Sequence, residues 1–96
     1  MTPAKKRSKK TVGWSLYVLK CSDNTLYTGI TNDLSRRLTQ HNNGTASRYT
    51  RSRLPVKILF QERCRGRSQA LRKEYAIKQF SRKEKEAYIL KKLDPR

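Results

Sequence analysis

The amino-acid sequence predicts one small α/β domain of the α+β type, with its elements in the order β-β-α-β-α-α. Its 96 residues match the length of a single domain, and 34% of them are hydrophobic, so the core that they form is small. Three short segments are rich in aromatic and branched residues, as strands are. Capping residues stand before three longer segments, where helices are expected to begin.

The first two strands are predicted to form a hairpin. They comprise Trp14–Lys20 and Leu26–Thr31, and turn-forming residues occupy positions 22–25 between them. Because the connection is so short, the two strands are expected to pair in antiparallel fashion.

A helix is predicted after the hairpin. Asn32 or Asp33 caps its start, it runs to about Asn43, and Gly44 ends it. Residues 45–54 are then expected to form a polar, arginine-containing loop.

One strand and two helices complete the predicted order. The strand covers 56–62, and a helix over 68–80 is capped by its first residue, a serine. Ser81 and Glu84 form a capping box, which opens a last helix that ends near residue 93. The residues of these two helices that are expected in the core are Leu71, Tyr75, Ile77, Ala87, Leu90 and Leu93.

The charge of the chain indicates a nucleic-acid partner. Lys and Arg number 24 against 7 Asp and Glu, which gives a net charge of +17. Residues 1–11 are predicted to be a flexible basic arm, residues 12–93 the folded domain, and residues 94–96 a short tail. The folded part is also strongly basic, and binding a polyanion relieves such self-repulsion while it releases counterions.

Several other classes of protein are excluded by the composition. No apolar stretch approaches the roughly 18 residues of a membrane span, and no apolar region follows the basic arm as it does in a secretory signal. Cys21 and Cys64 fit no metal-site spacing, and free thiols favour a cytoplasmic location, with association to the nucleoid left open. The few scattered carboxylates also argue against a nuclease that uses two metal ions.

One set of residues carries possible chemistry. Tyr17 lies on the first predicted strand, and Tyr27 follows ten residues later on the second. Arg37 lies ten residues beyond Tyr27, and His41 comes one helical turn after it, so these two side chains share a helix face. A lone acid, Glu74, stands within an otherwise basic helix.

This arrangement resembles the GIY-YIG nuclease family. The GIY element is present as S-L-Y at 15–17 and the YIG element as Y-T-G at 27–29, and the family's helical arginine corresponds to Arg37. The polar residue one turn later is His41, and the metal-binding glutamate corresponds to Glu74. The likeness covers about residues 14–90 and is strongest to small, stand-alone, single-domain bacterial members.

The chain departs from the family pattern at three positions. Ser15 replaces the glycine, and Leu16 and Thr28 each replace an isoleucine, whereas Gly29 keeps the motif glycine. These are backbone or packing positions, so the departures bear on rate more than on the type of reaction. The resemblance implies a three-stranded antiparallel sheet flanked by helices.

The resemblance also implies a role for each residue. Glu74 binds one Mg²⁺ or Mn²⁺, and a single carboxylate suffices for an ion that keeps several waters. Arg37 clamps the scissile phosphate with its planar fork. Tyr27 is the general base, assisted by Tyr17, and His41 orients the neighbouring groups or relays a proton.

Each of these residues has an ordinary structural interpretation when taken singly. A tyrosine on a strand is usually half-buried packing, and His41 is a partner for the helix C-terminal dipole. Glu74 is then one half of an ion pair with Lys78. It is the family spacing of the whole set that favours an active site.

Basic and aromatic residues around this set are expected to contact nucleic acid, with a solvated surface as the alternative. They are Arg36, Arg48, Tyr49, Arg51 and Lys78. The expected function is a metal-dependent endonuclease that nicks double-stranded or branched DNA, as a monomer or weak dimer without a membrane partner. The alternatives are a non-catalytic nucleic-acid-binding module and a basic RNA-associated protein, which the absence of an RNA-binding sheet motif disfavours.

The register of the hairpin offers a geometric test. With Cys21 opposite Leu26, Tyr17 and Tyr27 point to opposite faces of the sheet, and with Cys21 opposite Tyr27 they share a face. The nuclease hypothesis predicts the arrangement in which the two tyrosines share a face.

Overall fold

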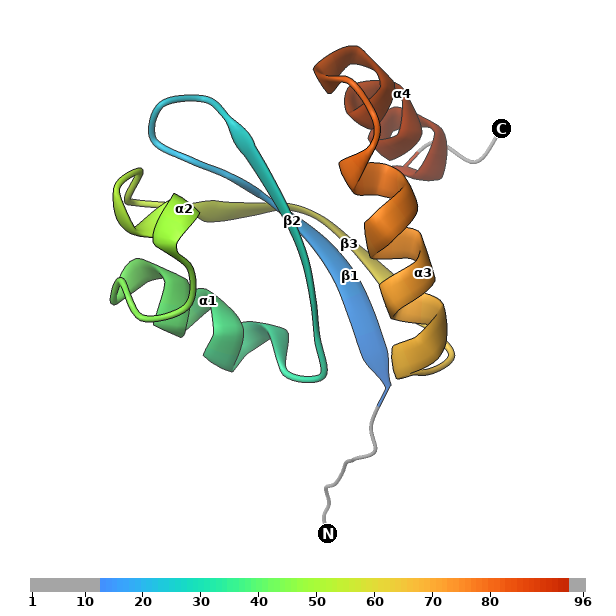
Figure 1. The fold of residues 1–96 in the computed structure, drawn as a ribbon, viewed down its shortest axis with the longest axis horizontal. Coiled ribbons are helices and arrows are strands. Elements are labelled where there is room, and N and C mark those ends of the chain that lie inside the picture. Colours follow the sequence, from blue (N-terminus) through green and yellow to red (C-terminus); the bar gives the residue numbers. More distant parts are fainter. Residues whose placement is uncertain (1–12, 94–96) are drawn as a thin grey trace, which may run out of the picture.

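A computed structural model describes residues 13–93 of the chain. Three strands, β1 (Trp14–Lys20), β2 (Leu26–Thr31) and β3 (Lys57–Cys64), form one antiparallel sheet in the order β2-β1-β3 (Figure 1). The five middle residues of the central strand β1 are buried, as is typical of an apolar strand that is covered on both faces. The predicted basic arm and C-terminal tail lie outside the described residues.

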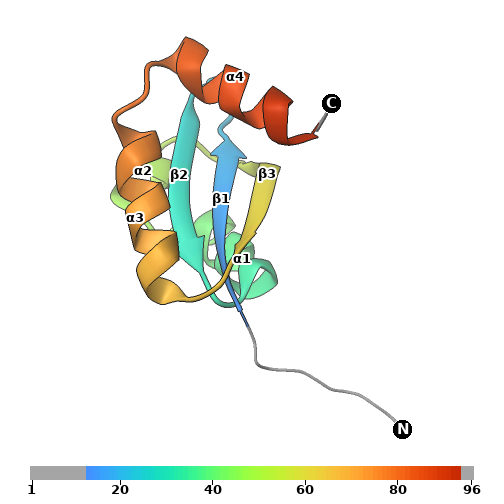
Figure 2. The ribbon, with the colours of Figure 1, turned by 90° about the vertical axis from the view of Figure 1, so that its right-hand side faces the viewer.

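Helices cover both faces of this sheet. They are α1 (Leu34–Asn42), α2 (Arg48–Arg51), α3 (Arg67–Lys78) and α4 (Arg82–Leu93). Figures 1 and 2 show α1 and α2 on one side of the sheet and α3 and α4 on the other. The predicted fold class is therefore confirmed. No helix within residues 13–93 is long and apolar enough to cross a membrane.

Alternate residues of β1 belong to two separate cores. The core under α3 and α4 contains Leu16, Val18, Phe60, Cys64, Ala70, Ile77 and Ile89. The core under α1 and α2 contains Tyr17, Leu19, Cys21 and Val56, with Tyr27, Leu34, Leu38 and Leu54 packed against it. Because strand side chains alternate between faces, this split follows directly from the order of residues in β1.

The hairpin takes a register in which Lys20 pairs with Leu26 and Tyr17 with Gly29. Neither of the two pairings considered for Cys21 is present. The Cys21 N–H instead donates to the Thr25 carbonyl oxygen at 2.9 Å and closes the turn. Leu19 is opposite Tyr27, which places Tyr17 and Tyr27 on the same face. The shared face predicted by the nuclease hypothesis is thus confirmed.

Local capping signals correctly marked both ends of α1 and the start of α4. The Asp33 side chain accepts a hydrogen bond from the Arg36 N–H at 3.1 Å and caps α1, and Gly44 follows its end with φ of +80°. Before α4, the Ser81 N–H donates to Glu84 at 2.8 Å and the Glu84 N–H donates to the Ser81 hydroxyl oxygen at 3.1 Å. The predicted capping box is therefore confirmed.

Two details of the predicted secondary structure were wrong. The expected loop over 45–54 contains the short helix α2, whose first N–H groups are capped by the Ser47 side chain. Helix α3 begins at Arg67, after Gly66, and Ser68 is inside the helix rather than its cap.

The core predicted for α3 and α4 was also largely wrong. Ile77 is buried, but five other residues expected in the core are exposed: Leu71, Tyr75, Ala87, Leu90 and Leu93. The small sheet gives each helix a narrow contact, so residues at the margin of the apolar face stay in water.

Candidate active site

A chain of hydrogen bonds joins β1, α1 and α2 beneath the surface. The Tyr17 hydroxyl lies 2.9 Å from His41 Nε2, and His41 Nδ1 lies 2.8 Å from the Thr50 hydroxyl oxygen. The Thr50 hydroxyl in turn donates to the Ser47 carbonyl at 3.4 Å. That direction makes His41 Nδ1 a donor to Thr50 and His41 Nε2 the acceptor of the Tyr17 proton.

The electrostatic environment keeps both rings of this chain neutral. Burial raises the pKa of Tyr17, and the nearby Arg37 guanidinium opposes that rise without cancelling it. Burial, and then the charge of Arg37, lower the pKa of His41. Tyr17 is 1% exposed, so it acts on a substrate only through its neighbours.

Gly29 is required by the position of the Tyr17 ring. Gly29 lies directly opposite Tyr17 in the hairpin, and a Cβ atom added to it would lie 2.6 Å from the Tyr17 hydroxyl oxygen and 2.7 Å from Cζ. The ring cannot yield easily, since it is buried and bonded to His41. The glycine of the motif therefore leaves the space that the tyrosine ring of the neighbouring strand occupies.

Tyr27 is the more accessible of the two tyrosines. It is half-buried, and its ring lies edge-on to His41 with 5.2 Å between the centroids. On its other side it stacks on Tyr49 at 5.9 Å, and the Lys78 ammonium lies 5.8 Å from its centroid. This packing holds the phenol in one orientation beside a cation.

Arg37 borders a small depression at the other end of the site. Its Nη1 donates to Gln40 Oε1 at 3.1 Å, and the guanidinium lies close enough to the Tyr17 hydroxyl to lower the pKa of that group. The depression has a volume of about 230 Å³ and is lined by residues of β1, β2 and α1, Trp14 and Arg36 among them. A planar cation at the edge of such a depression is suited to bind a phosphate.

Glu74 comes to the site from the opposite face of the sheet. It lies on α3, which packs against β1 and the edge strand β2. Its carboxylate pairs with Lys78 at 3.2 Å, and its charge contributes to the raised pKa of Tyr17. The ordinary ion pair with Lys78 is thus present, yet its Lys78 ammonium lies 5.8 Å from the centroid of the Tyr27 ring and the Glu74 charge acts on Tyr17.

The donors available for a metal ion are few. Within residues 13–93 no three His, Cys, Asp or Glu side chains are grouped so that they could hold an ion. The Glu74 side chain is 20% exposed, so its oxygens can be reached from solvent. A single accessible carboxylate fits a magnesium ion that keeps most of its waters, and it does not fit a closed structural site.

The residues expected to contact nucleic acid differ in how available they are. Arg36 is exposed and has an ion pair with Asp33 at 3.7 Å, and Arg48 and Arg51 are exposed on α2. Tyr49 stacks on Tyr27 with 5.9 Å between the centroids, and the Arg53 guanidinium carbon lies 3.9 Å from the Tyr49 centroid. Tyr49 nevertheless remains 37% exposed, so part of it is open to a ligand.

Three residues near the site were not found from the sequence. Thr50 completes the hydrogen-bonded chain, Gln40 holds Arg37, and Arg53 holds Tyr49. Two of them lie in the segment predicted as a loop, where no periodicity marks a buried position. Their roles depend on contacts between segments that no local pattern reveals.

Comparison with known proteins gives consistent results. The family profile of the GIY-YIG catalytic domain matches residues 13–92. A UPF0213 protein of Desulfotalea psychrophila is 54% identical over 69 residues, which are 71% of this chain and 63% of that protein. A UPF0213 protein of Streptococcus agalactiae serotype V is 51% identical over 74 residues, 77% of this chain and 84% of that protein.

Two solution NMR structures are similar as well. A UPF0213 protein from Bacillus halodurans has a TM-score of 0.57 and 35% identity, covering 86% of this chain and 88% of that chain. A protein from E. faecalis has a TM-score of 0.61 and 40% identity, covering 91% of each chain.

Proposed function

Because the chain belongs to the GIY-YIG family, whose catalytic domain it matches over residues 13–92, we propose that it is a metal-dependent DNA endonuclease that nicks its substrate. One observation carries the proposal. Two phenols, an imidazole, a guanidinium and a carboxylate from β1, β2, α1 and α3 interact with one another across the β2 edge of the sheet.

The proposed mechanism divides the work between an exposed and a buried layer. Arg37 binds the scissile phosphate and offsets the negative charge that grows during bond breaking. Tyr27, which a substrate can reach, acts in its phenolate form and becomes a neutral phenol when it takes the proton of the attacking water, with the Lys78 ammonium beside it. Tyr17 and His41 form the buried layer, which holds the Tyr27 ring in place.

Glu74 would hold the Mg²⁺ or Mn²⁺ ion. When bound, such an ion supplies a Lewis acid beside the phosphate. One metal site per domain favours the cutting of one strand at a time. The expected substrate is double-stranded or branched DNA bound by a monomer or weak dimer, and RNA is less favoured.

The decisive experiment is a nicking assay on supercoiled plasmid DNA with Mg²⁺ or Mn²⁺. Glu74→Gln and Arg37→Ala are each expected to lower the nicking rate by about 10²-fold or more, since each removes charge that acts on the reacting phosphate. The matched controls are Glu86→Gln, an exposed acid on α4, and Arg72→Ala, an exposed arginine on α3. Both controls are expected to retain most of the activity.

Two results would contradict the proposal. Nicking that survives in both Glu74→Gln and Arg37→Ala would indicate a contaminating nuclease. Tight DNA binding by the wild-type protein without nicking under either metal would favour the alternative, a non-catalytic nucleic-acid-binding module.

A further inference from the structure

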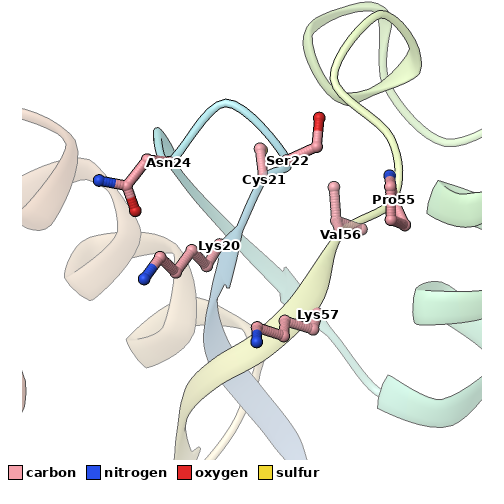
Figure 3. Close-up of a pocket in the computed structure, with 7 residues that line it drawn as sticks. All are labelled: Lys20, Cys21, Ser22, Asn24, Pro55, Val56 and Lys57. Carbon is pink, nitrogen blue, oxygen red and sulfur yellow. The ribbon is translucent and has the colours of Figure 1, made fainter.

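A second charged feature lies at the hairpin end of the sheet, at the opposite end from the depression beside Arg37. A cavity of about 350 Å³ opens there between the last residues of β1, the turn to β2 and the first residues of β3 (Figure 3). Two of the side chains that line it, Lys20 and Lys57, carry positive charge. Neither residue belongs to the proposed active site.

The two lysines oppose each other across neighbouring strands. Lys20 pairs directly with Lys57 in the register of β1 and β3, and Figure 3 shows both side chains extending to the same side of the strands. Within residues 13–93 neither forms an ion pair with a carboxylate. Like charges that face each other directly destabilise a sheet, so this pair lowers the stability of the protein without a ligand.

The acidic residues around the cavity already have other partners. Asp23 in the turn is paired with Arg53 at 3.0 Å, and Glu86 on α4 is paired with Arg82 at 2.8 Å. Arg82 also donates from Nη1 to the Asn24 carbonyl at 2.7 Å, which brings a further cation to the turn. These two ion pairs are neutral overall, and within residues 13–93 no carboxylate forms an ion pair with either lysine.

We propose that Lys20 and Lys57 together bind a backbone phosphate of the nucleic acid, at a contact separate from the cleavage site. Two ammonium groups on one side of a cavity match the charge of a phosphate group, to which lysine binds as a point charge. The chain carries a net charge of +17, which favours the phosphate backbone of a nucleic acid as the source of that group.

The two lysines lie near Tyr27 along the sheet but on its other face. Leu19, the neighbour of Lys20, pairs with Tyr27 in the hairpin, so the cavity and Tyr27 lie at the same end of the sheet. Because neighbouring residues of a strand point to opposite faces, Lys20 and its partner Lys57 point away from the Tyr27 face, and a nucleic acid that contacts both places has to pass around this end of the sheet. The inference rests on the proposed nucleic-acid substrate, but it does not require that the protein cut it.

The test is a salt titration of DNA binding, measured by fluorescence anisotropy with a labelled duplex oligonucleotide and no divalent metal. The double variant Lys20→Gln/Lys57→Gln is expected to reduce the slope of log K against log salt by about two, because two phosphate-neutralising cations are lost. The control Lys83→Gln/Lys91→Gln removes the same charge from exposed positions on α4 outside the cavity. Equal reductions in both double variants would overturn the proposal in favour of diffuse attraction.

A second variant separates binding from folding. Lys57→Glu places opposite charges across the strand pair, so the melting temperature of the free protein is expected to rise by a few degrees. DNA affinity is expected to fall by about tenfold or more, since the same change repels a phosphate. A variant that loses stability and affinity together, or that gains stability with unchanged affinity, would contradict a phosphate site at this pair.

Inorganic phosphate distinguishes the source of the ligand. At equal ionic strength, millimolar phosphate is expected to leave the melting temperature of the wild-type protein close to its value in chloride. Stabilisation by phosphate that disappears in Lys20→Gln/Lys57→Gln, with an unchanged DNA salt slope, would overturn the assignment to nucleic acid and indicate a free phosphate ligand. Nicking is a separate measurement, so loss of the nuclease proposal would leave these results intact.

Discussion

The two faces of β1 are both buried, but their chemistry differs. Toward α3 and α4 the strand presents Leu16 and Val18, which pack in an apolar core. Toward α1 and α2 it presents Tyr17, whose hydroxyl enters the chain through His41 to Thr50. One strand therefore supports a packing layer on one side and an ordered polar layer on the other.

The two faces also differ in how their polar groups are satisfied. Tyr17, His41 and Thr50 are each at most 1% exposed, and each has a hydrogen-bond partner. On the apolar face, the hydroxyl of Thr28 is buried and has no partner among the described residues. A buried polar group costs stability unless it is paired. The buried polar groups around Tyr17 are therefore paired, whereas the unpaired Thr28 hydroxyl lowers the stability of the fold.

The largest effect is expected from removing the centre of the polar layer. His41→Leu leaves the Tyr17 hydroxyl without its acceptor and Thr50 without its donor, so the free energy of unfolding should fall by about 2–4 kcal/mol. Urea denaturation measures the change. A loss below about 0.5 kcal/mol would show that the polar layer does not contribute to stability, and the two faces would then not differ in this respect.

A smaller loss of stability is expected when a methyl group fills the space that Gly29 leaves for the Tyr17 ring. Gly29→Ala places a methyl group 2.6 Å from the Tyr17 hydroxyl oxygen, which should cost about 1–3 kcal/mol and reduce nicking by displacing the site. The control is Gly66→Ala, where an added methyl group meets nothing within 4 Å. Equal losses in the two variants, by the same denaturation assay, would remove the argument that Tyr17 requires this glycine.

The two faces should respond to acid in different pH ranges. The pKa of His41 is lowered from its ordinary 6.5 by burial and by Arg37, so the unfolded chain binds the proton more readily. Stability therefore falls as the pH drops below about 6.5 toward the folded pKa, and levels off beneath it. Melting temperatures measured between pH 8 and pH 3 test this, and His41→Leu should remove the upper step.

On the other face the acid response comes later. Burial tends to raise the pKa of Glu62, but hydrogen bonds from Lys73 and Tyr88 outweigh it, and the pKa lies below its ordinary 4.5. The stability that Glu62 contributes is present above that value and is lost as the pH falls through the folded pKa. Glu62→Gln should remove this lower step and leave the His41 step unchanged. A single step shared by both variants would contradict separate titration of the faces.

Among the changes to the two faces of β1, the smallest effect on stability, and the only gain, is expected at Thr28. Thr28→Val keeps the shape of the side chain and removes the unpaired hydroxyl, so the free energy of unfolding should rise by about 1 kcal/mol. Because Thr28 faces the apolar core, nicking should stay the same. A loss of stability would show that this hydroxyl has a partner, and the two faces would then be alike in satisfying their buried polar groups.

Features that depend on neighbours in the chain were predictable. The caps at Asp33, Ser81 and Glu84 lie within three residues of the groups that they bond, so their patterns are visible in the sequence. The hairpin and its shared tyrosine face were predictable too, although its exact register was not, since a one-residue change in the turn shifts every pair.

Features that depend on packing were not predictable. Helix α2 has four residues, too few for a periodic pattern, and it is capped by Ser47 and anchored by the burial of Thr50. Leu90 and Leu93 have the spacing of a core face, yet they are exposed because the sheet beneath α4 is too small to cover them. Apolar periodicity indicates which side of a helix faces the core, but it does not determine how deeply each residue on that side is buried.

The residues themselves thus determined the elements, the charge and the family spacing of Tyr17, Tyr27, Arg37, His41 and Glu74, because these follow from local order along the chain. The folded arrangement decided which groups surround them. His41 bonds to partners 24 and 9 residues away, and the charge of Glu74 acts on Tyr17 from the opposite side of the sheet. Such contacts arise only when separate segments pack together, since hydrogen bonds and charges act over a few ångströms of space and are blind to distance along the chain.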